Sequence, residues 1–236
     1  MFRTAVLVIH GFCGSLWENE NLVNYLQQFR NLDVYAYTLP DHEKDFLTKS
    51  DYKKWISSTE LHVQKLLKRY NKVILIGHSM GGVIASYLAT KYKIHKLILI
   101  APAFEYLNFE QNKADILKPK SKKDDGAIYN EVVSKLIRYS PLVLNEFRKL
   151  VKEYKEVIKE VNTSTLILHG NDDELVPLSS SEYAFNNIKT KDKNLTIIKG
   201  GRHRIFLTAQ NETICNYIYK YIKGGLSWKL MKKQEL

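Results

Sequence analysis

A serine enclosed between two glycines, directly after a short apolar run, is the feature that most restricts how this chain can fold. The run is Val73–Ile76, the pentapeptide Gly-His-Ser-Met-Gly follows at 77–81, and a helical pattern begins at once. A turn this tight between a strand and a helix needs glycine on both sides of Ser79, because a Cβ there would collide with the crossing backbone. The pentapeptide therefore predicts a strand, a sharp corner and a helix, with the Ser79 hydroxyl exposed at the corner.

The same corner predicts a position for negative charge. The N–H groups that open a helix point outward, so they can stabilise an anion held above the Ser79 hydroxyl. Met80 carries the first of these N–H groups. A glycine-containing turn in an unrelated α/β protein would show the same five residues, so the rest of the chain has to decide between the two interpretations.

Strand and helix patterns alternate along most of the chain, which predicts a mostly parallel, doubly wound sheet with helices on both faces. Strands are expected at 5–9, 32–39, 73–76, 96–101, 165–169 and 195–199, and helices at 17–29, from 50 onward, 80–92, 179–187 and 205–222. Ser50 is the expected N-cap of the second helix, whose buried stripe would include Trp55, Leu61 and Leu66. With 236 residues, 44% of them hydrophobic, the chain is expected to form one domain over 1–223.

Residues 104–161 interrupt the alternation, and the sequence predicts a helical insertion there, after the strand at 96–101. Ser140-Pro141 places an N-cap before a proline at the first helical position, and apolar residues then recur at spacings of three and four. The stripe includes Leu144, Phe147 and Val151. Burying each such side chain contributes about 1.5–3 kcal/mol, so the stripe must lie against apolar partners. Two interpretations stay open: a lid whose stripe contacts a bound ligand, or an ordinary packed helix.

Charge and cysteine content exclude several classes of protein. The formal net charge is +11, but the lysines are dispersed rather than gathered in a stripe with aromatic residues, so nucleic-acid binding is not expected. The two cysteines, Cys13 and Cys215, lie far apart and do not suggest a disulfide framework. The histidines are not grouped on one element as metal ligands would be.

The chain shows no targeting or membrane-spanning signal. No run approaches eighteen apolar residues, and the apolar run before His10 is too short for a signal peptide. We therefore expect a cytoplasmic protein without stable membrane insertion. Residues 224–236 are expected to form a basic C-terminal tail outside the domain.

Further polar groups follow two of the expected strands, where the loops of a parallel sheet gather functional side chains. Acidic residues occupy 172–174, and His203 follows the strand at 195–199. A serine hydroxyl is a weak nucleophile that needs an imidazole to accept its proton, and the imidazole needs a carboxylate to hold its tautomer. Ser79, Asp173 and His203 offer these three groups in that order along the chain. Asp172 is the alternative carboxylate, and Glu174 is a weaker one.

Four motifs in this order resemble the α/β-hydrolase superfamily. They are HGF at 10–12, GHSMGG at 77–82, HGNDDELVP at 169–177 and the glycine-preceded His203. The resemblance covers 4–103 and 163–223 and implies an α/β-hydrolase fold. Within the superfamily, the chain looks most like bacterial carboxylesterases and monoacylglycerol-lipase-like serine hydrolases.

The resemblance implies a role for each matching residue. Ser79 would be the nucleophile, His203 the general base and acid, and Asp173 the orienting carboxylate, since the family's acid stands three residues after the glycine. The backbone N–H groups of Phe12 and Met80 would form the oxyanion hole. The implied reaction is hydrolysis of a small-molecule carboxylic ester with an apolar acyl or alcohol part, without a cofactor or a metal.

Two other functions are compatible with the same residues. One is a thioesterase or acyltransferase that uses the same triad, and the other is a non-catalytic ligand-binding protein of this fold. The remaining histidines receive simpler interpretations. His10 and His78 are expected to hydrogen-bond loop backbone and His169 to be structural, whereas we expect solvent exposure for His42, His62 and His95.

Overall fold

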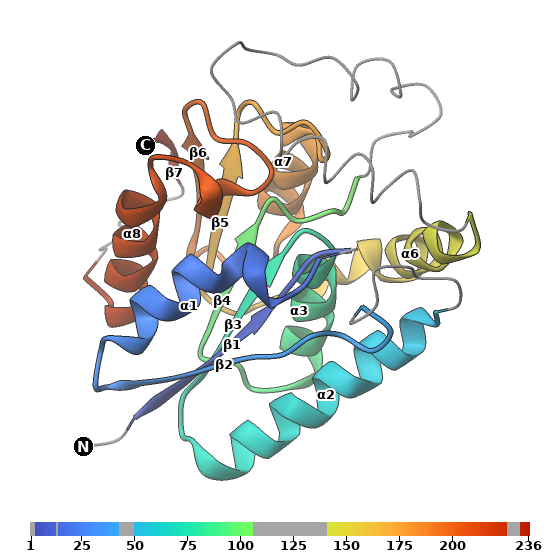
Figure 1. The fold of residues 1–236 in the computed structure, drawn as a ribbon, viewed down its shortest axis with the longest axis horizontal. Coiled ribbons are helices and arrows are strands. Elements are labelled where there is room, and N and C mark those ends of the chain that lie inside the picture. Colours follow the sequence, from blue (N-terminus) through green and yellow to red (C-terminus); the bar gives the residue numbers. More distant parts are fainter. Residues whose placement is uncertain (1–2, 13, 43–49, 106–140, 226–231) are drawn as a thin grey trace.

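The computed structural model describes residues 3–12, 14–42, 50–105, 141–225 and 232–236. Within them, seven strands form one sheet in the order β2-β1-β3-β4-β5-β6-β7, and every neighbouring pair is parallel (Figure 1). The strands are β1 (Thr4–Ile9), β2 (Leu32–Ala36), β3 (Val73–His78), β4 (Lys96–Ile100), β5 (Thr165–Gly170), β6 (Lys193–Ile198) and β7 (Lys232–Glu235). The parallel sheet predicted from the alternation is confirmed.

Helices cover both faces of this sheet (Figure 1). They are α1 (Glu20–Gln27), α2 (Tyr52–Arg69), α3 (Met80–Lys91), α6 (Pro141–Tyr154), α7 (Leu178–Asn187) and α8 (Asn211–Lys223), with short 3-10 helices η1 (Leu16–Asn19), η2 (Lys155–Glu160) and η3 (Ile205–Leu207). Because successive strand residues point to opposite faces, the strands divide their apolar side chains between two hydrophobic clusters. On β1, Leu7 and Ile9 join the cluster with α2, α3, α6 and α7, and Val6 and Val8 join the cluster with α1 and α8.

The strand order reverses at β1, which fixes where a site can form. From β1 the chain moves outward to β2 and then returns to place β3 on the other side of β1. Loops that leave the carboxyl ends of the two strands at such a reversal diverge and leave a crevice between them. The loop that begins at His10 and the turn at Ser79 leave β1 and β3 at this position.

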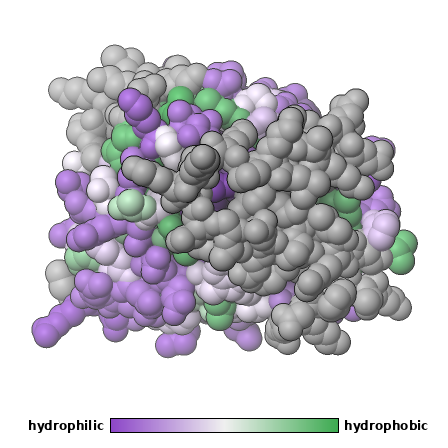
Figure 2. Space-filling view, turned by 45° about the horizontal axis from the view of Figure 1, so that its top comes forward, coloured by the Kyte–Doolittle hydropathy of each residue, from purple (hydrophilic) through white to green (hydrophobic). Residues whose placement is uncertain are grey.

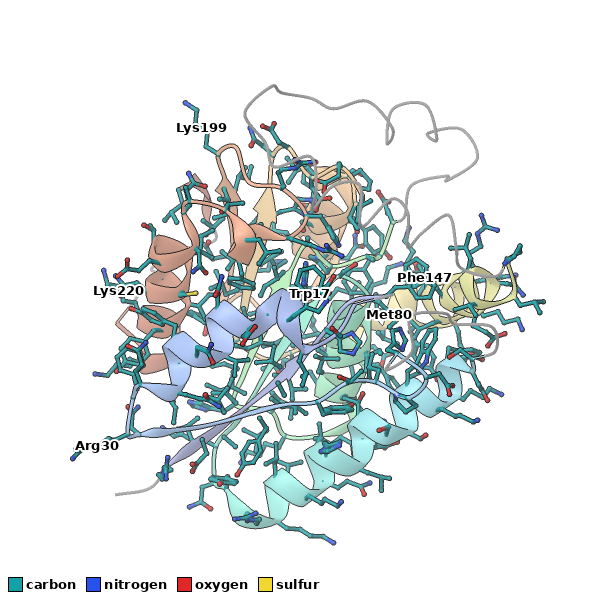
Figure 3. All side chains as sticks on the ribbon, viewed as in Figure 1. Trp17, Arg30, Met80, Phe147, Lys199 and Lys220 are labelled. Carbon is teal, nitrogen blue, oxygen red and sulfur yellow. The ribbon has the colours of Figure 1, made fainter. Side chains whose placement is uncertain are left out.

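Helices α6 and η2 form most of the described part of the predicted insertion, and residues 106–140, including Ser140, lie outside the described residues. Of the two, α6 carries the predicted stripe. It contacts α2 and α3 on one face of the sheet. Phe147 and Val151 are buried and Leu144 is half-buried, so the predicted stripe does face apolar partners. In Figure 3, Phe147 on α6 and Met80 at the start of α3 lie on the same side of the sheet, and both belong to one cluster.

Three local expectations were wrong. Asp51, not Ser50, caps α2, because its Oδ1 accepts the N–H of Lys53 at 2.9 Å, whereas Ser50 Oγ accepts from Trp55 Nε1 at 2.9 Å. Leu61 is 56% exposed, outside the buried stripe of α2. The final helix begins later than expected, since η3 and α8 are separate elements.

The strand expected at 32–39 is also shorter, because its pairing with β1 ends at Ala36. Beyond that point, the N–H of Leu39 donates to a side chain instead of a strand, namely to His10 Nε2 at 2.8 Å. At the other edge of the sheet, residues 232–235 pair with β6 as strand β7. Part of the segment set apart as a basic tail therefore extends the sheet.

The described surface in Figure 2 is mostly hydrophilic, and hydrophobic residues appear there as small separate patches. None of the helices within the described residues combines the length and the hydropathy needed to cross a lipid bilayer.

Candidate active site

Ser79 occupies the sharp corner between β3 and α3 that the sequence predicts. Its backbone has φ 54° and ψ −118°, a conformation that residues other than glycine rarely adopt and that costs about 1–3 kcal/mol. Backbone hydrogen bonds hold the corner: the Ser79 N–H donates to Ile100 O at 2.8 Å, and Ser79 O accepts from Ala103 N at 3.1 Å. The corner is thus anchored to the end of the neighbouring strand β4, and its strain is balanced by contacts outside the turn.

The glycines of the pentapeptide are required by close backbone contacts. A Cβ on Gly77 would lie 2.3 Å from Gly81 O, and a Cβ on Gly81 would lie 2.3 Å from Ile9 O. The loop after β1 also approaches closely, though less so, since a Cβ on Gly11 would lie 3.0 Å from the Cβ of Ser79. The predicted steric reason for these glycines is therefore correct, and the loop of the HGF motif lies directly beside the serine.

His203 and Asp173 are in direct contact, although they come from different loops. His203 Nδ1 lies 2.8 Å from Asp173 Oδ2, and the other carboxylate oxygen, Oδ1, accepts the N–H groups of Leu175 and Val176, each at 2.8 Å. Burial acts to raise the pKa of Asp173, but the facing His203 and His169 and the hydrogen bond from Val176 outweigh it. The pKa of Asp173 is therefore lowered, and the carboxylate is charged at neutral pH.

The neighbouring acidic residues have other contacts. Asp172 is exposed, and its N–H donates to Gly201 O at 3.0 Å. Glu174 accepts the backbone N–H of His203 at 3.2 Å through Oε2. Of the three candidate carboxylates, the one paired with the His203 imidazole is thus Asp173.

Burial and nearby carboxylates compete over the charge of His203. Burial favours the neutral imidazole, but Asp173, Glu174 and Glu18 favour the charged form, and the pKa of His203 is raised above its ordinary value. Because Nδ1 faces Asp173, the other ring nitrogen, Nε2, points away from that carboxylate. Such an imidazole can accept a proton at Nε2 while Asp173 stabilises the resulting charge.

Ser79 and His203 are linked through the residue that precedes the serine. His78 Nε2 donates to the backbone carbonyl of His203 at 3.0 Å. The contacts of the described residues do not include a hydrogen bond between Ser79 Oγ and His203 Nε2. Hydrogen bonds between catalytic groups are often long before substrate binds and shorten in the complex. The structure thus joins His203 to Asp173 directly and to Ser79 through His78.

The backbone donors expected beside Ser79 lie on two elements. Met80 is the first residue of α3, so its N–H has no intrahelical acceptor. Phe12 lies on the loop after β1, where its ring stacks on Phe147 of α6 with centroids 4.9 Å apart. His10 anchors this loop. Its Nδ1 donates to Gly11 O at 2.8 Å, and its Nε2 accepts the N–H of Leu39, in the segment after β2, at 2.8 Å.

His42 was expected to be solvated, and this expectation was wrong. It is only 6% exposed, and its ring packs edge-on against His10 at 5.2 Å, Phe12 at 6.3 Å and Trp55 at 5.2 Å. Asp41, with φ 69°, turns the chain so that the following side chain enters the core. Burial lowers the pKa of His42 to about 4, so the ring is neutral near pH 7.

His62, also expected to be exposed, is half-buried, and its ring stacks on Tyr37 with centroids 4.0 Å apart. His10, His78, His95 and His169 match their simpler interpretations. His169 is fully buried and hydrogen-bonded on both nitrogens: Nδ1 pairs with Ser181 Oγ at 2.6 Å, and Nε2 with Val176 O at 3.1 Å. Burial lowers the pKa of His169, which keeps the ring neutral beside Asp173. Cys13 lies outside the described residues, and Cys215 is a buried free thiol. No group of side chains that could hold a metal ion occurs in the part of the chain that the structure describes.

The sequence did not predict an ion pair that joins η1, which follows the loop after β1, to the loop of His203. Arg204 Nε donates to Glu18 Oε1 at 3.0 Å, both side chains are more than nine-tenths buried, and the guanidinium lies 4.4 Å from the Trp17 ring centroid. The two residues are 186 positions apart, so neither spacing nor periodicity could have paired them.

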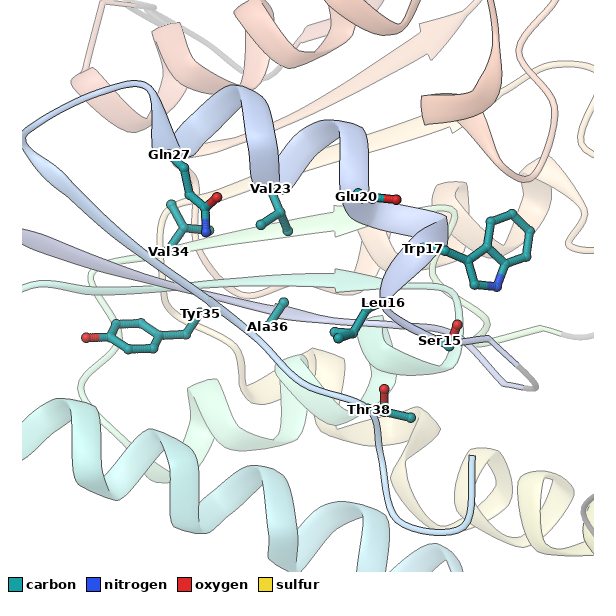
Figure 4. A pocket seen from close by; sticks show the side chains of 10 residues that line it. All are labelled: Ser15, Leu16, Trp17, Glu20, Val23, Gln27, Val34, Tyr35, Ala36 and Thr38. Atoms are coloured by element: carbon teal, nitrogen blue, oxygen red, sulfur yellow. The ribbon is translucent and has the colours of Figure 1, made fainter. Parts of the chain in front are cut away.

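Two of the surface grooves lined by described residues lie away from the candidate site, and neither contains Ser79, Asp173 or His203. One of about 650 Å³ lies between α1 and the edge strand β2, where Leu16 and Val23 face Val34 and Ala36 (Figure 4). The other, of about 540 Å³, lies along α6 over Phe104. The candidate site is therefore identified by the contacts of its side chains rather than by these grooves.

Comparison with known proteins shows the family of this chain. The family described as serine aminopeptidase, S33, matches residues 2–210. The chain belongs to this family of α/β hydrolases. It is 25% identical to a putative esterase/lipase 3 of Mycoplasma pneumoniae, over 94% of this chain and 86% of the relative, and 19% identical to a carboxylesterase of Bacillus subtilis, over 95% and 94%.

The fold of this α/β hydrolase is also found among solved structures. A soluble variant of monoglyceride lipase from Saccharomyces cerevisiae, in complex with a substrate analogue, superimposes with a TM-score of 0.72. The match covers 96% of this chain and 88% of the lipase, at 20% sequence identity. The α/β-hydrolase fold expected from the four sequence motifs is thereby confirmed.

Proposed function

We propose that this α/β hydrolase cleaves carboxylic esters through an acyl-enzyme formed on Ser79. His203 accepts the hydroxyl proton at Nε2 as Ser79 attacks the ester carbonyl, and the same proton then passes to the departing alcohol. Asp173 holds the imidazole and stabilises its positive charge. In the second half, His203 activates a water molecule that releases the acid and regenerates the serine.

The observation that carries the proposal is the contact between His203 Nδ1 and Asp173 Oδ2 at 2.8 Å. The backbone carbonyl of His203 is in turn hydrogen-bonded to His78, the residue before Ser79. A base whose pKa is raised by a buried carboxylate is suited to accept a proton in the transition state near neutral pH. The esterase and lipase names of the relatives support the same chemistry. The N–H groups of Met80 and Phe12 are proposed to hold the oxyanion.

The substrate is proposed to carry an apolar acyl or alcohol part, with α6 as a lid. Phe147 brings the insertion into contact with the loop that carries Phe12, and Val151 is buried on the same helix. Leu144 is half-buried, which leaves part of its side chain for a ligand. Binding pockets for small molecules are mostly apolar with a few polar groups that orient the ligand, and this composition fits that description.

A series of chromogenic esters of increasing acyl length tests the proposal on the wild type, on Ser79→Ala and on Ser57→Ala. Ser57 is an exposed serine of α2 and serves as the matched control. Loss of Ser79 is expected to lower kcat by roughly a millionfold, and loss of Ser57 is expected to leave it unchanged. Turnover by Ser79→Ala at the wild-type rate would eliminate the acyl-enzyme at this residue.

Competing activities are separated in the same experiment. Labelling by a fluorophosphonate at Ser79 alone identifies an active serine and excludes a purely ligand-binding protein. A thioester, an alcohol acceptor and an aminoacyl anilide are offered in parallel with the best ester. A kcat/KM for any of them well above that for the ester would replace ester hydrolysis with thioesterase, acyltransferase or aminopeptidase activity.

A further inference from the structure

The main chain of His203 is held on both sides by side chains outside the proposed triad. Its N–H donates to Glu174 Oε2 at 3.2 Å, and its carbonyl accepts from His78 Nε2 at 3.0 Å. Glu174 directly follows Asp173, and His78 directly precedes Ser79. Glu174, next to Asp173, and His78, next to Ser79, therefore both hydrogen-bond the backbone of His203.

The loop of His203 needs such bonds, because its own sequence does not make it rigid. Gly200 and Gly201 precede it, and Gly200 has φ +70° with nothing within 4 Å of a Cβ placed there. Glycine has a wide choice of backbone conformations, so a loop that contains two in succession is ordered only by contacts from outside. The hydrogen bond from the ring to Asp173 can fix the ring only if the backbone beneath it is also fixed.

His78 is suited to donate a hydrogen bond and not to exchange protons. It is 1% exposed, and burial together with the facing His203 lowers its pKa to about 3, so it is neutral with a single ring proton. A carbonyl oxygen can only accept, so that proton stands on Nε2. The other nitrogen, Nδ1, is buried and has no hydrogen-bond partner within the described residues. An apolar side chain would avoid this unpaired nitrogen, so what histidine contributes at 78 is the Nε2 donor.

Glu174 combines an acceptor with a charge. Its carboxylate accepts from the N–H of His203 and lies 3.4 Å from Arg202 Nε, and its side chain is 12% exposed. The negative charge favours the protonated form of the imidazole and contributes to the raised pKa of His203. The two effects can be separated, because a glutamine keeps an oxygen acceptor and loses the charge.

We propose that His78 and Glu174 are positioning residues that hold the backbone of His203, so that Nδ1 stays on Asp173 and Nε2 faces Ser79. This inference rests on the proposed function and extends it to two residues outside the triad. The reason is mechanical: the two peptide groups that flank the Cα of His203 each make a hydrogen bond, which leaves the imidazole little freedom beyond rotation about its own side-chain bonds. A displacement of about 1 Å at a reacting group can lower the rate by about a hundredfold.

The first test compares His78→Phe with His78→Gln. Phenylalanine keeps a buried ring without a donor, whereas the Nε2 amide of glutamine reaches about as far as the histidine Nε2. We expect His78→Phe to lower kcat for the best ester by about 10- to 100-fold with little change in KM, and His78→Gln to recover most of the loss. His95→Phe, at an exposed histidine, is the matched control. Wild-type kcat in His78→Phe, or equal losses in the phenylalanine and glutamine variants, would overturn the role of His78.

The second test compares Glu174→Gln with Glu174→Ala in a pH profile of kcat/KM. The groups that interact with His203 are Asp173, Glu174, Glu18, His78 and His169. On its own loop, Arg202 bonds Glu174 and Arg204 bonds Glu18. Glutamine removes one negative charge, so the acidic limb should move to lower pH while kcat at the optimum stays within about threefold of wild type. Alanine should move the limb equally and also lower kcat by about tenfold or more. Equal kcat in the two variants would show that Glu174 acts by charge alone and would overturn its positioning role.

An NMR titration of the His203 imidazole provides a readout that does not depend on turnover. In the wild type, the Nδ1 proton should give a downfield resonance that marks the bond to Asp173. In His78→Phe and Glu174→Ala this resonance should broaden or disappear, while the denaturation midpoint shows that the protein is still folded. An unchanged resonance in both folded variants would overturn the proposal. If instead Ser79→Ala retained full ester turnover, the proposed function would fail, and the NMR result would still report on the backbone bonds of His203.

Discussion

Phe147 of α6 stacks nearly parallel on Phe12 of the loop after β1, with ring centroids 4.9 Å apart and an interplanar angle of 17°. The contact joins the helical insertion to the loop proposed to donate one oxyanion N–H. Phe12 also lies 6.0 Å from Trp55 of α2, so its ring stands between two helices. The position of this loop therefore depends on side chains far from it in the sequence.

Phe147→Ala is expected to destabilise the protein and to lower kcat for ester hydrolysis. Phe147 is 4% exposed, and truncation of a buried phenylalanine to alanine typically costs about 3–5 kcal/mol in the free energy of unfolding. Urea denaturation measures the stability, and initial rates in the absence of denaturant measure kcat. Leu142→Ala, at a residue of α6 that is 69% exposed, is the control and should change neither by much. Equal effects of the two substitutions would mean that the ring contact with Phe12 has no special role.

Asp173→Asn should lower kcat/KM by about 10⁴-fold, by analogy with removal of the orienting carboxylate from other serine enzymes. The pH profile of kcat/KM shows whether Asp173 raises or lowers the pKa of His203. Because Asp173 helps to raise the pKa of His203, the acidic limb of the wild-type profile should lie above the ordinary histidine value of about 6.5. The limb should move to lower pH in the asparagine variant. A profile of kcat/KM that keeps the same acidic midpoint in Asp173→Asn would contradict the pairing.

His42→Phe should reduce the loss of stability on acidification. The pKa of His42 is about 4 in the folded protein and about 6.5 in the unfolded chain, so between these values the unfolded chain binds one more proton. Stability therefore falls as the pH falls from about 6.5 to 4, by up to about 1.4 kcal/mol per pH unit for this group. Urea denaturation at pH 7 and pH 5 measures the difference. Phenylalanine should weaken the dependence and also remove the unpaired Nε2; an unchanged pH dependence would refute the assignment.

Two glycine substitutions separate steric exclusion from backbone conformation. Gly81→Ala should prevent folding of the corner, because the new Cβ would lie 2.3 Å from Ile9 O, a backbone atom that cannot move away. Gly200→Ala meets no atom within 4 Å and is strained only by φ +70°, so its cost should be about 1–2 kcal/mol. The yield of folded protein and the denaturation midpoint measure the two effects. A folded, active Gly81→Ala variant would disprove the close approach of β1 to the corner.

Several parts of the fold and of the candidate site could be predicted because they depend on local sequence. The corner at Ser79 needs only a strand, glycines and a helix in succession, and all three lie within 73–91. The resemblance to the α/β-hydrolase motif favoured Asp173 over its acidic neighbours, and the structure places that carboxylate against His203. The alternation of short apolar runs with helical patterns predicted the parallel sheet, since a strand buried on both faces appears as an uninterrupted apolar run.

Other parts could not be predicted, because they depend on residues that only the folded chain brings together. The burial of His42 results from the turn at Asp41 and from rings on α2 and on the loop after β1. The bond from His78 to the carbonyl of His203 spans 125 positions, and a backbone carbonyl leaves no trace in a residue pattern.

The sequence by itself determined which chemical groups the chain carries and at which strand ends they stand, because strands, tight turns and capping motifs are encoded within a few residues. Only the tertiary structure decided which of these groups meet and how firmly they are held. The physical reason is that strand order and loop packing set the distances between side chains, and a hydrogen bond forms or fails within a few tenths of an ångström.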